Sequence, residues 1–236
     1  MTHQKSISAY ISTLTISLVL LLCATNVTAQ NKKGGSRVNG FTQKADTTAL
    51  FKGFAVSVDM VGLGQKLLGD YGQYEAALRL NLKDKYFPIV ELGYGECNHT
   101  DDATDINYKT KAPYGKIGID FNVLKNKHDI YRLYAGLRYA ITSFKYDLFK
   151  PGVTDPVWGG QVDYSLSGVK CSYQWFEAVF GVDAKIAGPV HLGWSVRYRS
   201  RTSSDTGENG DCWYVPGFGK SGSSNLGGTF NVSIDI

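Results

Sequence analysis

The sequence predicts an all-β protein that folds as an eight-stranded antiparallel up-and-down transmembrane β-barrel. Three observations lead to this fold. Apolar and polar residues alternate in eight segments, long and short connections alternate between these segments, and the chain begins with an expected export signal. Alternation with a period of two gives each strand one apolar face and one polar face. A barrel with its apolar face toward lipid and its polar face toward its lumen accounts for all three observations.

The first 29 residues have the features of a secretory signal peptide. Lys5 supplies a positive start, residues 11–22 form an apolar core, and Ala29 precedes the expected cleavage site. The core is too short to cross about 30 Å of hydrocarbon. Residues 30–50 are polar and without periodicity, so we expect a flexible N-terminal segment there and the barrel over residues 51–236.

The expected strands follow one another along the rest of the chain. The last one shows the pattern most clearly, because Phe230, Val232 and Ile234 are separated by single polar residues. The eight strands are expected at residues 54–60, 74–82, 90–95, 116–123, 131–141, 176–186, 190–199 and 226–236. Single-chain outer-membrane barrels have an even number of strands, starting at eight.

The connections between these strands alternate in length. Short connections are expected at residues 83–85, 125–128 and 187–189, and long ones at residues 61–73, 96–113, 142–174 and 200–225. A membrane barrel with short periplasmic turns and long outer loops requires this alternation. A soluble sandwich could produce the period of two, but it has no reason to sort its connections by length.

The polar faces of the expected strands carry seven acidic and seven basic residues. An eight-stranded barrel is only wide enough inside to be filled by side chains, and a buried charge without a partner is costly. We therefore expect a packed lumen with a charge network. Its members are Asp59, Glu75, Arg79, Glu91, Lys116, Asp120, Arg132, Arg138, Glu177, Asp183, Lys185, Arg197, Arg199 and Asp235.

Charge and cysteine content exclude several classes of protein. Without the signal peptide the chain has 24 Lys and Arg residues against 21 Asp and Glu residues, a balance too even to indicate nucleic acid binding. Cys97, Cys171 and Cys212 lack the spacing of a zinc site. Cys171 and Cys212 fall in two outer loops, and we predict a disulfide between them, which export permits.

No metal or cofactor is expected. Asp101, Asp102 and Asp105 lie together in the second outer loop, and their oxygen atoms are of the kind that binds Ca²⁺. The spacing and the glycine of an EF-hand are absent, so we interpret this segment as a solvated acidic loop.

Aromatic residues in the third and fourth outer loops are candidates for contact with a partner. Trp158 lies in the third loop, and Trp213, Tyr214 and Phe218 lie in the fourth, next to proline and glycine. Two interpretations stay open at this point. The rings pack on one another and cap the barrel mouth, or they contact an extracellular protein or glycan.

Several segments of the chain resemble a known family. They are KGFAVSVDMVG at 52–62, LRLNLKDKYFP at 78–88, ELGYGE at 91–96, GLRY at 136–139, TDPVWGG at 154–160 and WYVPGFGKSGSSNLGGTFNVSIDI at 213–236. The chain from about Leu50 to Ile236 thereby resembles a family of Bacteroidetes outer-membrane β-barrels classed as a domain of unknown function, small porin-like barrels of the OmpA/OmpX type. The resemblance implies a barrel in the outer membrane. It supplies no activity, ligand or catalytic residue.

The expected function is that of a non-enzymatic protein of the bacterial outer membrane, embedded in lipid, whose loops contact a partner outside. The first alternative is a channel or carrier for small solutes or lipids. The second is a membrane hydrolase that uses His191 and Ser195, which share the polar face of one expected strand. Residues four apart in a strand are about 13 Å apart, which is too far for a nucleophile and its base. No catalytic residue is therefore expected.

Overall fold

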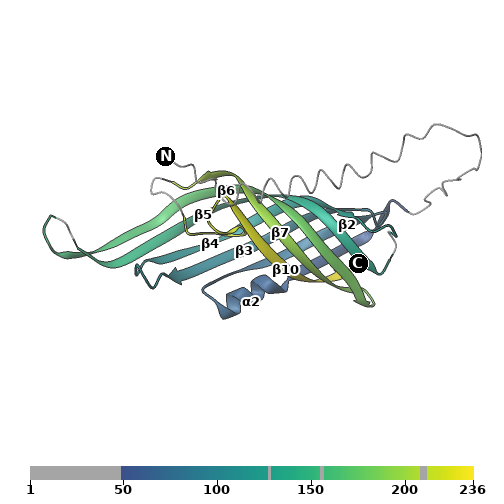
Figure 1. The fold of residues 1–236 in the computed structure, drawn as a ribbon, viewed down its shortest axis with the longest axis horizontal. Coiled ribbons are helices and arrows are strands. Elements are labelled where there is room, and N and C mark those ends of the chain that lie inside the picture. The colour runs from purple at the N-terminus through teal and green to yellow at the C-terminus, as the bar shows by residue number, and fades with distance from the viewer. Residues whose placement is uncertain (1–48, 127–128, 155–156, 208–211) are drawn as a thin grey trace, which may run out of the picture. The chain divides into compact units, whose positions relative to one another are not determined.

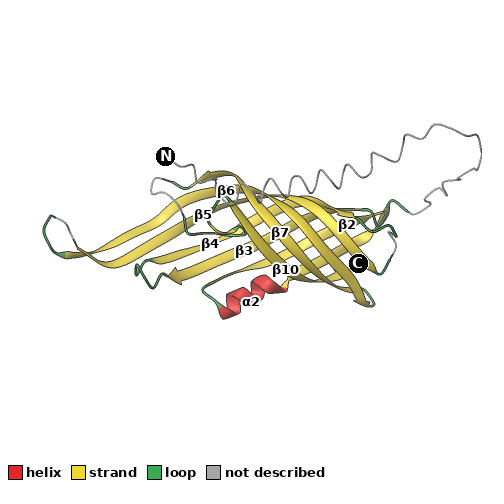
Figure 2. Ribbon diagram, in the orientation of Figure 1, coloured by secondary structure: helices red, strands yellow, loops and turns green. Residues whose placement is uncertain are grey.

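The computed structural model describes residues 49–126, 129–154, 157–207 and 212–236. The expected signal peptide and almost all of the expected N-terminal segment lie outside the described residues. The described chain is a closed antiparallel barrel, with one helix and one short hairpin added to it (Figures 1 and 2). No helix in the described part is long and apolar enough to cross a bilayer.

Eight strands close the barrel, and each pairs with its neighbour in the chain until the last one pairs with the first. This confirms the predicted eight-stranded up-and-down barrel. The strands are β1 (Phe51–Asp59), β2 (Tyr71–Leu82), β3 (Tyr86–Thr100), β4 (Asn107–Asn122), β5 (Tyr131–Thr154), β6 (Gln161–Ala187), β7 (Val190–Asp205) and β10 (Ser224–Asp235).

Most strands continue further toward the long loops than the sequence predicts. The largest difference concerns β5 and β6, which pair as far as Thr154 and Gln161. The prediction of a loop over residues 142–174 is therefore wrong. Beyond Phe149, β5 no longer pairs with β4, and beyond Ser172, β6 no longer pairs with β7. The ends of β5 and β6 thus form a two-stranded hairpin that continues past the other strands (Figure 1).

A reversal of side-chain polarity explains this difference. On β5, Leu137 and Ile141 point outward and are 60% and 52% exposed. A few residues further, Phe144 and Tyr146 are buried inside, while Lys145 between them is exposed. The apolar face of the strand thus changes from the outside to the inside. A search for one uninterrupted apolar face ends at Ile141, although the strand itself continues.

The reversal occurs at one level around much of the barrel. Thr142 on β5 pairs with Tyr114 on β4 and with Tyr173 on β6. On β6 the outward residues change at this level from Phe176 to Gln174. We call the part between this level and the short turns the lower barrel, and the part on the other side the upper barrel. The lower barrel is apolar outside, and the upper barrel is polar outside.

The first long connection contains a helix that the sequence pattern did not predict, α2 (Met60–Leu68). Asp59 caps it, because its carboxylate accepts hydrogen bonds from the backbone N–H groups of Val61 (3.0 Å) and Gly62 (3.2 Å). A side chain at Gly62 would collide with Gln73 on β2, so glycine lets the helix lie close to that strand. The last long connection contains the hairpin of β8 (Tyr214–Val215) and β9 (Gly219–Lys220).

Candidate functional site: the lumen and the outer mouth of the barrel

Glu91 lies at the centre of the lower barrel and is fully buried. Three cations from three other strands surround it. Its carboxylate lies 2.8 Å from Nη1 of Arg197, 3.1 Å from Nε of Arg138 and 3.7 Å from Nζ of Lys116. All four side chains point inward because each occupies the inward-facing position of its strand's alternation. The inward faces of the strands therefore bring opposite charges together at a place that bulk solvent does not reach.

Toward the long loops, the network continues through two further glutamates. Lys116 Nζ lies 2.9 Å from Glu75 and 3.1 Å from Glu177. Arg197 Nη1 lies 3.0 Å from Glu75, and Arg199 Nε lies 3.2 Å from Glu177. Each of these carboxylates thus has two or more cationic neighbours.

Toward the short turns, the network continues through two aspartates. Arg138 donates to both carboxylate oxygens of Asp120, at 2.7 and 2.9 Å. Arg79 lies 3.6 Å from Asp120 and 3.1 Å from Asp183. Asp183 in turn lies 2.9 Å from Nδ1 of His191. Ion pairs therefore run without interruption through the lower barrel.

The ion pairs fill the lumen. The space left among Glu75, Arg79, Glu91, Arg138 and Arg197 is about 10 Å³. A cavity needs at least about 10–15 Å³ to hold a single water molecule. The centre of the lower barrel is therefore a packed polar core.

Four of the predicted lumen residues lie outside this central chain of ion pairs. Asp59 is buried, but it caps α2. Arg132 is half-buried near the short turns and stacks on an aromatic ring. The side chain of Asp235 is partly exposed and lies 2.9 Å from Nε2 of His191. Lys185 is exposed, so its assignment to the lumen is wrong, because it is close to the turn at Gly188 where the wall ends.

The structure does not assemble His191 and Ser195 into a nucleophile and its base. Both ring nitrogens of His191 face carboxylates, those of Asp183 and Asp235. Ser195 Oγ instead lies 2.7 Å from Oγ1 of Thr229. A serine nucleophile needs a base within hydrogen-bond reach, and these partners leave none for Ser195.

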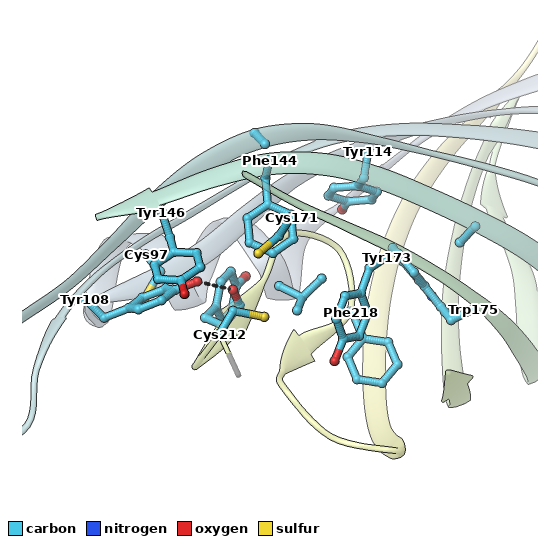
Figure 3. Packing of buried hydrophobic residues seen from close by; sticks show 14 residues of the cluster. Cys97, Tyr108, Tyr114, Phe144, Tyr146, Cys171, Tyr173, Trp175, Cys212 and Phe218 are labelled. Atoms are coloured by element: carbon cyan, nitrogen blue, oxygen red, sulfur yellow. Dashed lines mark hydrogen bonds between the residues drawn. The ribbon is translucent and has the colours of Figure 1, made fainter. Parts of the chain in front are cut away.

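A second, apolar core closes the upper barrel (Figure 3). Residues 212–218 of the last long connection fold inward, and we call this segment the plug. Tyr108 on β4 donates a hydrogen bond to the carbonyl of Tyr214 (2.8 Å), and the ring of Phe218 packs against Trp175. The buried cluster comprises Cys97, Tyr108, Ala112, Tyr114, Ala140, Phe144, Tyr146, Cys171, Tyr173, Trp175, Cys212, Tyr214, Val215 and Phe218.

Two of the four aromatic contact candidates belong to this core. Tyr214 and Phe218 are 2% and 0% exposed, so of the two interpretations left open for these rings, capping of the mouth is confirmed and contact with a partner is wrong. Trp213 is half-buried and stacks on His99, with 4.4 Å between ring centroids. Trp158 lies near the tip of the β5–β6 hairpin and is 86% exposed. Proline and glycine beside the rings indicated ordered loops, but they did not indicate whether the aromatic side chains point inward or outward.

The predicted disulfide is absent. Cys97, Cys171 and Cys212 are all thiols, although Cys171 and Cys212 lie within hydrogen-bonding contact of each other. The prediction was therefore right about their proximity and wrong about the bond. Burial raises the pKa of Cys97 and of Cys171 to about 12, so both are protonated and unreactive near neutral pH.

In the acidic loop between β3 and β4, Asp101 forms hydrogen bonds within the loop itself. Asp101 accepts hydrogen bonds from the hydroxyl and the backbone N–H of Thr104, and these lower the pKa of its carboxyl group. Among the described residues, no three His, Cys, Asp or Glu side chains are grouped so that they could hold a metal ion.

The fold and its lumen define a closed β-barrel with a packed interior. The chain belongs to the family described as a domain of unknown function, DUF6048, whose model matches residues 11–236. No curated protein matches it. The crystal structure of Neisserial surface protein A (NspA) is similar over 79% of this chain and 99% of its own, with a TM-score of 0.42 and 12% sequence identity.

The central position of Glu91 leads to a stability prediction. In Glu91→Gln the shape is kept but three buried cations lose a common partner, so we expect the free energy of unfolding to fall by about 3–5 kcal/mol. The control is Lys66→Gln, which breaks a part-exposed pair with Glu96 and is expected to cost at most about 1 kcal/mol. Urea titration of the folded barrel in detergent micelles, followed by heat-modifiable gel migration, measures both. Equal losses for the two variants would contradict the central role of Glu91.

Proposed function

We propose that this protein is an integral barrel of the bacterial outer membrane that neither conducts solutes nor catalyses a reaction, and that it presents its β5–β6 hairpin to a partner protein outside the cell. The observation that carries the proposal is the reversal of polarity between the lower and the upper barrel. The expected signal peptide supports export across the inner membrane.

The outside of the lower barrel has the character of a lipid-facing wall. Large apolar side chains are exposed on every strand of it, among them Leu92, Ile117, Leu137, Phe180 and Trp194. A soluble protein rarely exposes a continuous apolar surface of this kind. Above the level of Thr142 the outward residues become polar, as expected where a wall leaves lipid and enters water.

The interior supports a closed barrel over the alternative of a channel. The lower lumen is filled by paired charges, and the plug and the side chains around it close the upper barrel. An ion or small solute crossing the barrel would have to displace both. The absence of an available base beside Ser195 favours a non-enzymatic role over the hydrolase.

The β5–β6 hairpin supports contact with a protein. Beyond Phe149 and Ser172 its two strands pair only with each other, so each presents one strand edge without a partner among the described residues. Such an edge can accept a strand from another chain through main-chain hydrogen bonds. Exposed Val153, Val162 and Tyr164 flank these edges and would add apolar contact.

The packed lumen leads to a conductance prediction. The purified mature protein, inserted into planar lipid bilayers, is expected to give no single-channel steps, because no aqueous path crosses the ion-pair network. Insertion is checked in vesicles of the same lipid by protection of the barrel from protease. Reproducible current steps from inserted protein would contradict the closed lumen and favour the channel.

The hairpin leads to a crosslinking prediction. With a photoreactive benzoylphenylalanine in place of Val162, illumination of intact cells of the native organism is expected to give one protein adduct of defined mass. The matched control replaces Val182, an equally outward residue of the same strand in the lower barrel, and is expected to give no protein adduct. Adducts at both positions, or at neither, would contradict recognition through the hairpin.

A further inference from the structure

The wall of the barrel has an opening between β2 and β10. β1 ends at Asp59, opposite Asn231, whereas β10 continues to Ser224 and β2 begins at Tyr71. Residues 224–230 of β10 therefore have no strand of the described chain beside them on this side. Helix α2 lies there instead and contacts both β2 and β10 (Figure 2).

The opening lies within the apolar part of the outer surface. Gly228 and Leu226 on β10 pair with Val196 and Tyr198 on β7, two outward residues that are both exposed. Only beyond them, at Ser200, does the outward face of β7 become polar. On the proposed membrane location, the opening therefore faces the outer leaflet of the bilayer.

The edge of β10 directs hydrogen-bonding groups into this opening. Phe54 and Ile236 exchange two backbone hydrogen bonds, of 3.1 and 2.8 Å, across β1 and β10. Because such bonds alternate along an antiparallel strand, the even-numbered residues of β10 point their N–H and C=O groups toward the β1 side. Asp59 accepts the N–H of Phe230 (3.3 Å). Leu226 and Gly228 thus direct theirs into the gap that β1 leaves.

Inside the opening lies a polar pocket of about 450 Å³ between α2, β10 and the β8–β9 hairpin. Arg199 and Lys220 supply its positive charge. Arg199 is nine-tenths buried; its Nε pairs with Glu177 and its Nη1 donates to the carbonyl of Phe218, which leaves Nη2 without a protein partner among the described residues. The carboxylate in the lining, Asp59, is already engaged by backbone N–H groups.

Outside the opening lies an apolar groove of about 540 Å³, bordered by α2, Phe180 and Trp194. Gly228 forms part of its floor, and a Cβ atom there would meet only ordinary contacts, so the groove is space left by a missing side chain. The groove and the polar pocket adjoin each other at α2 and β10, because both are lined by Val61, Gln65, Leu226, Gly227 and Gly228.

We propose that this opening binds one membrane lipid with an anionic headgroup. An acyl chain lies in the groove over Gly228, and the headgroup enters the polar pocket, where it meets Lys220 and Nη2 of Arg199. A polar cavity with two cations beside an apolar groove matches the two ends of such a molecule. The exposed side chains of Leu67 and Leu68 at the end of α2 would rest in the same leaflet. This inference rests on the proposed location in a membrane.

The test is native mass spectrometry of the mature protein released from detergent micelles, with added phosphatidylglycerol, phosphatidylcholine or inorganic phosphate. We expect one phosphatidylglycerol per barrel, bound about 10-fold more tightly than phosphatidylcholine, because both phosphates are anionic but the choline cation of phosphatidylcholine is repelled by Arg199 and Lys220. Gly228→Trp fills the groove and is expected to weaken this binding at least about 10-fold. Lys220→Gln is expected to weaken it about 2- to 5-fold, as for an exposed ion pair.

Two controls separate the site from general effects. Gly115→Trp makes the same change at an outward glycine of β4, across the barrel from β10, where the space is also open. It should leave lipid binding unchanged. Lys111→Gln removes an exposed lysine of β4 that does not line the pocket. If Gly228→Trp fails to show heat-modifiable migration, Gly228→Leu takes its place.

The outcomes distinguish this inference from the proposal that it rests on. Equal loss of binding in Gly228→Trp and Gly115→Trp, or equal affinity for the two lipids, would overturn the lipid site and leave the membrane barrel standing. Binding of inorganic phosphate with the affinity of the lipid would overturn it too, because the pocket would then be an ion site. A protein that is monodisperse without detergent would instead overturn the membrane location itself.

Discussion

Charged side chains inside the lower barrel can be stable only if every one of them meets an opposite charge, because the wall around them is apolar and the lumen leaves almost no space for water. The structure meets this constraint by spreading the charges over neighbouring strands. Glu91 on β3 binds cations from β4, β5 and β7, so no single strand can shift without breaking pairs on several others. A slip of one residue would turn these charges toward the outside. The network therefore fixes the register of the barrel as well as filling it.

Beyond the level of Thr142, the same strands meet the opposite requirement, which is a polar outer face around an apolar interior. There the outward residues are polar and the inward ones are Phe144, Tyr146 and their neighbours, which need an apolar filling. The plug supplies it, since Tyr214 and Phe218 enter from the last long connection. One continuous set of strands thus builds an apolar-walled tube with a charged core and, above it, a polar-walled tube with an aromatic core.

Most of the lower barrel could be predicted from the sequence, but little of the upper barrel could. Alternation located all eight strands and placed eleven charged side chains, among them Glu91, Arg138 and Arg197, where the structure has them buried. It failed where the polarity changes sides, because Thr142 and Phe144 break the pattern that defined the strand. It left open whether Tyr214 and Phe218 cap the mouth or meet a partner, because their burial depends on residues far away in the sequence, such as Tyr108 on β4 for Tyr214 and Trp175 on β6 for Phe218. Helix α2 is short and lies on β2, so tertiary contact, more than its own sequence, holds it in place.

The opening between β2 and β10 follows from the same geometry. β1 is the shortest of the barrel strands, and the chain leaves it at Asp59 to form α2. The missing length of β1 exposes the polar interior of the mouth to the apolar outer surface at one place in the wall. Neither the period of two nor the loop lengths carry this information, because it depends on where β1 stops relative to its partner β10.

The most direct measurement is the depth of outward-facing positions along β5 in lipid vesicles. Spin labels at residues 137, 141, 145 and 147 report their accessibility to oxygen, which concentrates in lipid, and to a water-soluble nickel complex. We expect the labels at 137 and 141 to be accessible to oxygen and those at 145 and 147 to the nickel complex, with the change between 141 and 145. The same environment at all four positions would contradict the account, because the polarity reversal would then mark no membrane boundary.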